Sequence, residues 1–158
     1  MADEKYEKVV FEPIGYVESD IDPEHNYNPR EVMAKIIIKN ELEEALEGIE
    51  DFTHIIVIYW THKLSGIPFP LKVHPRNDPN ITIRGVFSTR SPIRPNCIGL
   101  TVVKLENRKN NVLKVRGLDA FNGTPVLDLK PYIKISDCIP ESEAPAFVKK
   151  ERNYYLTR

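Results

Sequence analysis

The chain has 158 residues, of which 41% are hydrophobic and 28% charged, a composition that predicts one folded domain and excludes a disordered or fibrous protein. Residues 1–60 carry 5 Lys/Arg and 15 Asp/Glu, whereas residues 61–158 carry 17 and 8. The basic second half favours a polyanionic partner, unless the two halves neutralise each other on folding. We expect one domain over residues 1–158, with residues 1–8 and 137–158 as peripheral tails.

Four classes of protein are disfavoured by simple patterns. The longest apolar run, residues 55–60, is far shorter than the roughly 20 residues of a membrane span. The first residues show no secretory signal, so we expect a cytoplasmic protein. Two cysteines and four histidines lack paired ligand spacing, so no metal is expected. The seven glycines are too widely spaced for a dinucleotide-binding glycine fingerprint or a P-loop.

The first half of the chain predicts strands around one short helix. Residues 9–17 are predicted as a strand bulged at 13–15, residues 18–30 as a loop and residues 34–38 as a second strand. Asn40, followed by Glu43 and ending at Gly48, predicts a capped helix. Its apolar face comprises Leu42, Ala45, Leu46 and Ile49. Residues 54–60 are the most hydrophobic strand, which we expect to be central and covered on both faces.

The second half predicts a long loop followed by short strands. Residues 63–81 contain four prolines and are predicted to be a functional or mobile loop. The strands that follow are expected at residues 84–88, 99–105, 112–118 and 126–135, with a turn at 108–111 and a second helix near 144–152. Short strands joined by turns predict a mainly β fold, a small antiparallel barrel or sandwich with one or two short helices.

The densest polar motif lies at residues 84–100 and contains Arg84, Arg90 and Arg94. Pro92 and Pro95 force the chain out of any central strand, so the arginines are presented from a rigid loop. A guanidinium held in this way suits recognition of carboxylate or phosphate groups. Pairing with surface acids is the alternative, although residues 63–94 carry six Lys/Arg and a single acid.

A second motif centres on Asn122-Gly123, a dipeptide typical of the turn in a hairpin. Thr124 and the backbone N–H groups beside Gly123 could hold a polar group of a ligand. Asp119 and Asp128 are candidate general bases, although carboxylates near turns more often accept hydrogen bonds from loops.

A third motif contains His54 and His62 on one face of the predicted strand, with Trp60 between them. Each histidine alone is more often structural than catalytic. His62 is the better functional candidate because it ends a strand before a long loop.

Several blocks together resemble the TsaA/YaeB-like (TrmO) family. They are residues 11–17 (FEPIGYV), 46–54 (LEGIEDFTH), 60–62 (WTH), 74–76 (HPR), 85–100 (GVFSTRSPIRPNCIGL) and 118–132 (LDAFNGTPVLDLKPY). The resemblance spans about residues 10–135. It implies a small β-barrel and S-adenosylmethionine-dependent methylation of tRNA at N6 of threonylcarbamoyladenosine 37. It also implies a homodimer with the cofactor near the subunit contact.

The resemblance also assigns residues. It places the cofactor near Arg30, Glu31, His62, Lys63, Arg90, Leu100, Asn122, Gly123, Thr124 and Pro125. Arg90 would bind the methionine carboxylate and Leu100 would cover the adenine. The chain departs from the family pattern at Asn122, where an acid is common, and at Cys97, where a second proline often stands.

Two further sets of residues complete the hypothesis. The candidates for accepting the N6 proton are Tyr59, His62 and Asp119. The expected tRNA contacts are Arg76, Arg84, Arg94, Lys104 and Arg116. Two alternatives remain: a non-catalytic RNA-binding β-barrel that stacks bases on Phe87, Phe121 and Tyr132, or a methyltransferase for another RNA or a small molecule.

Overall fold

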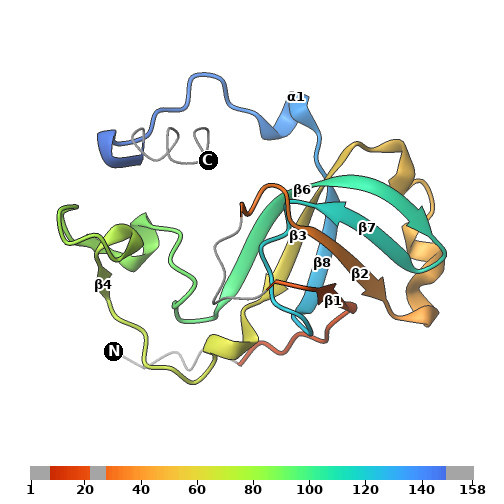
Figure 1. Cartoon of the computed structure of the whole chain (residues 1–158), viewed down its shortest axis with the longest axis horizontal. Coiled ribbons are helices and arrows are strands. Elements are labelled where there is room, and N and C mark those ends of the chain that lie inside the picture. Colours follow the sequence, from red (N-terminus) through yellow and green to blue (C-terminus); the bar gives the residue numbers. More distant parts are fainter. Residues whose placement is uncertain (1–7, 22–27, 149–158) are drawn as a thin grey trace, which may run out of the picture.

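Six antiparallel strands close into a barrel in the computed structural model, which describes residues 8–21 and 28–148 (Figure 1). The strands follow one another around the barrel in the order β1-β2-β7-β6-β3-β8. Their bounds are β1 Gly15–Ser19, β2 Met33–Ile38, β3 His54–Trp60, β6 Ile98–Lys109, β7 Val112–Arg116 and β8 Pro125–Pro131. The predicted mainly β fold, a small antiparallel barrel, is therefore confirmed.

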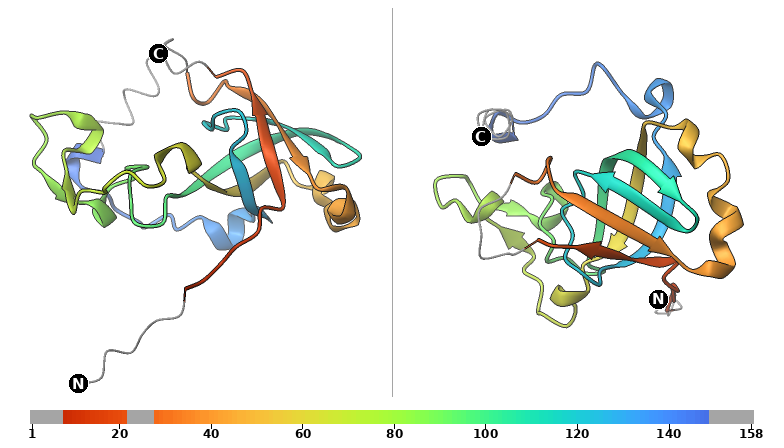
Figure 2. Two further views of the ribbon diagram at one scale, coloured as in Figure 1. Left: turned by 90° about the horizontal axis from the view of Figure 1, so that it is seen from below. Right: turned by 45° about the vertical axis from the view of Figure 1, so that its right-hand side comes forward.

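The remaining elements are short and lie outside the barrel wall. They are the two-stranded sheet of β4 (Lys72–Val73) and β5 (Arg84–Gly85), the 3₁₀ helices η1 (Asn40–Leu46), η2 (Ile49–Asp51), η3 (His62–Leu64), η4 (Pro75–Asn77) and η5 (Val86–Ser88), and the helix α1 (Lys134–Asp137). Residues 61–97 leave the barrel after β3 and return to it at β6. We call this excursion the arm; it extends from one side of the barrel in Figures 1 and 2. No helix within the described residues is long and apolar enough to cross a bilayer.

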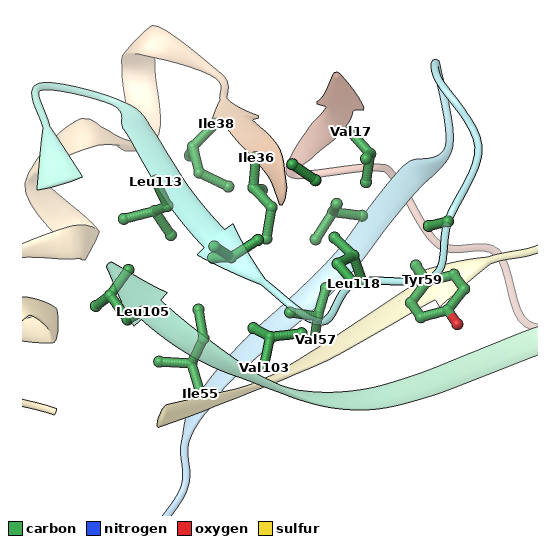
Figure 3. Close-up of a cluster of buried hydrophobic side chains, with 14 of the residues drawn as sticks. Val17, Ile36, Ile38, Ile55, Val57, Tyr59, Val103, Leu105, Leu113 and Leu118 are labelled. Carbon is green, nitrogen blue, oxygen red and sulfur yellow. The ribbon is translucent and has the colours of Figure 1, made fainter. Parts of the chain in front are cut away.

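The interior of the barrel is filled by alternate residues of each strand. Burial alternates along β1 and β2 as expected for strands with one face inside. The fully buried side chains include Ile36, Ile55, Val57, Val103, Leu113, Val115, Leu118 and Val126. Figure 3 shows many of these side chains meeting inside the barrel, with Tyr59 at one side of the cluster. Burying each such side chain contributes about 1.5–3 kcal/mol, so the barrel is a rigid base for the loops at its ends.

The expectation that β3 is covered on both faces is only half right. Ile55, Val57 and Tyr59 point into the barrel and are buried. His54 and Trp60, on the outer face, are exposed. A closed barrel has a single interior, so only every second residue of a strand can face the core.

Two of the predicted elements in the first half differ in detail. The first strand covers Gly15–Ser19 rather than residues 9–17, since Pro13 lacks the N–H that a ladder needs. The predicted helix is a 3₁₀ helix preceded by Lys39, and no side chain caps it. The Asn40 side chain instead accepts a hydrogen bond from the Asn111 amide, 2.9 Å away. The helix η1 ends at Leu46 with Glu47 as its C-cap, and Gly48, with φ 80°, instead precedes η2.

Boundaries also shift in the second half. β6 runs to Lys109, beyond the predicted end at residue 105, and the turn falls on Asn110, which has φ 54°. Only Arg84–Gly85 of the predicted strand 84–88 pairs with another strand; η5 follows it directly. β8 ends at Pro131, and α1 occupies part of the range predicted as strand. Of the helix predicted near 144–152, residues 146–148 are helical and residues 149–152 lie outside the described residues.

Candidate functional site

Four segments that carry predicted site residues meet at one end of the barrel. Residues 30–31 precede β2, residues 62–63 follow β3, residues 89–97 precede β6, and residues 117–124 join β7 to β8. In an antiparallel barrel with this strand order, the starts of β2, β6 and β8 and the ends of β3 and β7 lie at the same end. The topology therefore brings together residues that are up to about 90 positions apart in the sequence.

A direct contact joins η3 to the β7–β8 loop. The Lys63 ammonium lies 4.7 Å from the centroid of the Phe121 ring, within the range of a cation–π interaction. Lys63 thus lies beside the residue that directly precedes Asn122 and Gly123 in the β7–β8 loop.

That turn is fixed to β1 by three hydrogen bonds. The Gly123 N–H donates to the Val17 carbonyl (2.8 Å), and the Val17 N–H donates to the Thr124 carbonyl (2.9 Å). The Ser19 N–H donates to the side-chain oxygen of Asn122 (3.3 Å). Asn122 thus accepts a bond that a carboxylate would also accept, which explains how an amide can stand where an acid is common.

Within the turn, the predicted cofactor residues differ in exposure. Asn122 and Gly123 are exposed, and Gly123 has φ 78°, a left-handed conformation that favours glycine. Thr124 is only 3% exposed and Pro125 is buried behind it. The first two residues of the turn therefore face outward, whereas Thr124 and Pro125 support them from inside the barrel.

His62 has an unsatisfied ring nitrogen. Its Nδ1 is buried and has no hydrogen-bond partner among the described residues. The ring lies 6.3 Å from the Trp60 ring, centroid to centroid, at an interplanar angle of 54°. A buried polar atom left unpaired costs roughly 1–3 kcal/mol, so this nitrogen is suited to a proton or a polar group of a ligand.

Tyr59 is the second candidate proton acceptor, and its environment argues against that role. The side chain is only 8% exposed, and its hydroxyl is 3.2 Å from the Thr101 hydroxyl oxygen. Burial, and to a lesser extent the negative charge of Asp119, raises the pKa of Tyr59. A raised pKa keeps the phenol protonated at neutral pH, so it cannot accept a proton there. Asp119, the third candidate, is exposed on the β7–β8 loop.

Arg90 is the arginine best placed to bind an anion. Its side chain is exposed and forms no hydrogen bond or ion pair with any residue in the described ranges 8–21 and 28–148. Arg94 differs, because it is half-buried and its guanidinium donates to the carbonyls of Ser91 (3.2 Å) and Thr89 (3.4 Å). Arg94 therefore braces the loop around Arg90, whereas the sequence predicted it as an RNA contact.

Arg30 and Glu31 lie in a turn beside the β7–β8 loop. Both are exposed, and their N–H groups donate to the side chain and carbonyl of Asn28. Gly117, with φ 92°, packs against this turn: a Cβ added there would lie 3.6 Å from the Arg30 carbonyl oxygen. The Gly117 N–H also donates to the Val32 carbonyl (2.8 Å).

Leu100 lies on the outer face of β6 within an apolar surface. Its side chain is 55% exposed and pairs across the ladder with Ile58 of β3. The neighbouring pair, Ile98 and Trp60, is also exposed on this face. A barrel wall facing water usually carries polar residues here, so the surface is suited to an apolar ligand group or a protein partner.

The four predicted RNA contacts other than Arg94 fall into two groups. Lys104 and Arg116 both bind Glu106, at 3.2 and 2.7 Å, and the hydrogen bond from Arg116 is the main cause that lowers the Glu106 pKa. Arg84 and Arg76 lie on the arm instead. The Arg84 guanidinium lies 5.5 Å from the centroid of the Phe147 ring, and Arg76 is exposed in η4.

A cavity lies at the other end of the barrel. It measures about 390 Å³, and Asp128, a candidate general base, is the only candidate site residue that lines it. It is lined by Ile14, Ile38, Leu42, Ala45, Leu46, Glu47, Gly48, Ile49, Phe52, Asp128, Leu129 and Pro131. The predicted site residues Arg90, Leu100 and Asn122 are exposed in the single chain. Within residues 8–21 and 28–148, no three His, Cys, Asp or Glu residues are grouped to hold a metal ion.

The fold is a closed antiparallel β-barrel with polar loops gathered at one end, and comparison with known proteins identifies its family. A family profile described as "tRNA-methyltransferase O N-terminal domain" matches residues 16–138. The chain belongs to this family, which confirms the resemblance to TrmO proteins.

Individual relatives agree with this assignment. An S-adenosyl-L-methionine-binding protein of Archaeoglobus fulgidus is 41% identical over 140 residues, which cover 85% of this chain and 97% of that protein. A human tRNA (adenine(37)-N6)-methyltransferase is 40% identical over 132 residues, and the chain spans only 30% of its length. The crystal structure of TrmO from Pseudomonas aeruginosa superposes with a TM-score of 0.70 at 27% identity, covering 96% of this chain and 77% of that one.

Proposed function

We propose that this protein is an S-adenosylmethionine-dependent tRNA methyltransferase that methylates N6 of threonylcarbamoyladenosine at position 37. One observation carries the proposal: His62, Arg90 and the loop that contains Asn122 and Gly123 lie at the same end of the barrel. The names of the human and archaeal relatives support the reaction class and the cofactor. The threonylcarbamoyl group rests on the family resemblance.

The residues at this end fit the parts of S-adenosylmethionine. The cofactor is a zwitterion with a carboxylate, an adenine and a sulfonium that carries the reactive methyl group. Arg90 offers a guanidinium that no described residue engages, and a guanidinium binds a carboxylate through two parallel hydrogen bonds. Leu100 offers an exposed apolar surface for the adenine, and the outward-facing Asn122 offers polar groups.

His62 is our candidate for accepting the proton that N6 loses as it gains the methyl group. Its ring lies beside Trp60 at the end of the barrel where the candidate site residues gather, and an imidazole ring carries a nitrogen that can accept a proton. Tyr59 is not suited, because burial raises its pKa and keeps the phenol protonated. Beyond this transfer, the residues act by holding donor and acceptor about 3–3.5 Å apart in the right orientation.

The apolar outer face of β3 and β6 supports a homodimer. Three cross-strand pairs form it: Ile56 with Val102, Ile58 with Leu100, and Trp60 with Ile98. The three β6 members are 42–55% exposed. Because Leu100 also belongs to the candidate cofactor site, a second subunit docked here would cover a site residue that is exposed in the single chain.

The dimer is tested by sedimentation of Val102→Glu, which places a charge in the centre of this face. We expect the variant to sediment as a monomer. Ile37→Glu is the matched control, because Ile37 is 37% exposed on β2, outside this face. A dimeric Val102→Glu variant, or a monomeric wild-type protein, would contradict the proposed interface.

The reaction is tested by incubating the protein with labelled S-adenosylmethionine and tRNA that either has or lacks the threonylcarbamoyl group, followed by nucleoside analysis. We expect label only on N6-threonylcarbamoyladenosine. Arg90→Ala should weaken cofactor binding measured by calorimetry, and His62→Ala should lower the rate more than the affinity. If the cofactor produces no heat but RNA binds, the protein is an RNA-binding barrel; if both bind without transfer to this nucleoside, the substrate is different.

A further inference from the structure

Two segments of the candidate site lie outside the barrel ladder. The β3–β6 pairing ends at Trp60 opposite Ile98, whereas His62 and Arg90 lie in the arm beyond it. The regular strand hydrogen bonds therefore do not set where these two side chains lie relative to each other. Other contacts in the arm must do so.

Thr61 supplies those contacts. Its backbone N–H donates to the Cys97 carbonyl (2.8 Å), which extends the contact between the two chain segments by one residue. Its hydroxyl is 2.9 Å from the same carbonyl and 3.4 Å from the Pro92 carbonyl. A hydroxyl has one proton, so it bonds mainly to Cys97 with Pro92 as the weaker acceptor. The residue before His62 is thereby tied to two residues that follow Arg90 in the same loop, Pro92 and Cys97.

Cys97 and Arg94 complete the linkage from the loop side. Cys97 is 7% exposed and has φ 51°, a left-handed conformation that costs roughly 1–3 kcal/mol for a residue with a Cβ. Its thiol is within hydrogen-bonding distance of the Arg94 carbonyl (3.3 Å) and the Leu64 carbonyl (3.7 Å). Arg94 in turn closes the loop through its bonds to the Thr89 and Ser91 carbonyls. One continuous set of side-chain contacts thus runs from η3 to the residues on either side of Arg90.

We propose that Thr61 is a positioning residue that sets the placement of Arg90 relative to His62, and that Arg94 serves the same loop rather than RNA. The inference rests on the proposed cofactor site. It predicts that the Thr61 hydroxyl affects cofactor binding only through Arg90. A residue that merely stabilised the fold would not depend on Arg90 in this way.

The test is a double-mutant cycle measured as the dissociation constant for S-adenosylmethionine by calorimetry. Thr61→Val removes the hydroxyl and keeps the shape and the backbone bond. We expect it to weaken binding roughly five- to tenfold, the fold-change of one net hydrogen bond. In the Arg90→Ala background the same substitution should change binding less than about twofold.

Two further variants accompany the cycle. Thr61→Ser keeps the hydroxyl and should bind like the wild-type protein. Thr53→Val is the matched control, because Thr53 is exposed and directly precedes the opposite end of β3, roughly 25 Å from Thr61 at 3.3 Å per strand residue. This variant should leave cofactor binding unchanged.

The outcomes separate the positioning role from the proposed function. A wild-type protein that does not bind the cofactor overturns both. If the wild-type protein binds, equal losses from Thr61→Val with and without Arg90 overturn the positioning role alone. Unchanged cofactor binding by Thr61→Val also overturns the positioning role. Weaker cofactor binding by Thr61→Ser overturns it as well, and this variant stays informative even if Thr61→Val does not fold.

Discussion

Replacing Gly99 by alanine puts a methyl group into the ring of Tyr59. Gly99 lies on β6 directly opposite Tyr59 of β3, and the Tyr59 ring packs over it. An added Cβ would lie 2.5 Å from the ring Cζ and 2.9 Å from Cδ2, much closer than carbon atoms approach. The ring must therefore move, and its hydroxyl would leave the Thr101 hydroxyl oxygen, 3.2 Å away.

The expected cost follows from three contributions. Overpacking of a filled core costs about 1–3 kcal/mol. Loss of the Tyr59–Thr101 hydrogen bond adds about 1 kcal/mol. The lower backbone entropy of alanine in the unfolded chain returns about 0.4–1 kcal/mol. The free energy of unfolding should therefore fall by about 1–3.5 kcal/mol, which lowers the Tm by about 2–14 °C for a domain of this size.

Urea denaturation followed by circular dichroism measures this effect, with Gly85→Ala as the control. No atom lies within 4 Å of a Cβ built on Gly85, so that variant should be neutral or slightly stabilised. The clash is specific to Tyr59, so Gly99→Ala should cost less than about 0.5 kcal/mol in a Tyr59→Ala background. Equal stability of the two glycine variants, or a full cost in the Tyr59→Ala background, would refute the reasoning.

Three other predictions concern side chains around the barrel. Arg108→Lys should lower the free energy of unfolding, measured by urea denaturation, by about 1–2 kcal/mol. Lysine cannot replace the hydrogen bonds that the guanidinium donates to the carbonyls of Leu46 and Glu43. An unchanged urea midpoint would contradict this reasoning. Tyr59→Phe should keep methyl transfer within about threefold, since a phenol with a raised pKa is not the base; a hundredfold loss would reverse that conclusion. Arg116 and Lys104 lower the pKa of Glu106, so their pairing stabilises the fold above pH 4.5 and is lost as the pH falls through the lowered value. Glu106→Gln should thus be less stable than the wild-type protein at pH 7 and equal to it near pH 2, whereas a pH-independent difference would exclude the ion pair as its cause.

The strands with one strongly apolar face were predictable from sequence, and the irregular elements were not. β2, β3 and β7 were placed within a few residues, because alternating Ile, Val and Leu side chains can be buried only inside a sheet. The polar end of β6 was missed because pairing with β7, rather than apolar content, holds it. The Asn40 cap was wrong for a related reason: its side chain bonds to Asn111, a residue 71 positions away that no local pattern reveals.

The candidate site shows the same division. The motif containing Arg90 and the turn at Asn122-Gly123 were found because prolines and glycines mark rigid loops locally. Thr61 carries no such signal, since its importance lies in carbonyls 31 and 36 residues away. The burial of Tyr59, which argues against it as the base, is a tertiary property that the sequence does not reveal. Lys104 and Glu106 stand two apart on a strand, so their pairing could have been predicted from the period of β structure.

Few ion pairs between the described residues join the acidic first half of the chain to the basic second half. Among the ion pairs between described residues, one joins the acidic first half to the basic second half, Arg108 with Glu50. Lys104 and Arg116 pair with Glu106, and Lys130 pairs with Asp128, all within the second half. The arm carries six Lys/Arg and the single acid Asp78, whose side-chain oxygen accepts hydrogen bonds from Asn80 rather than a cation. Among the described residues, no ion pair joins an acid to Lys63, Lys72, Arg84, Arg90 or Arg94 of the arm, which makes these cations a better match for a polyanion such as tRNA than the paired cations of β6 and β7.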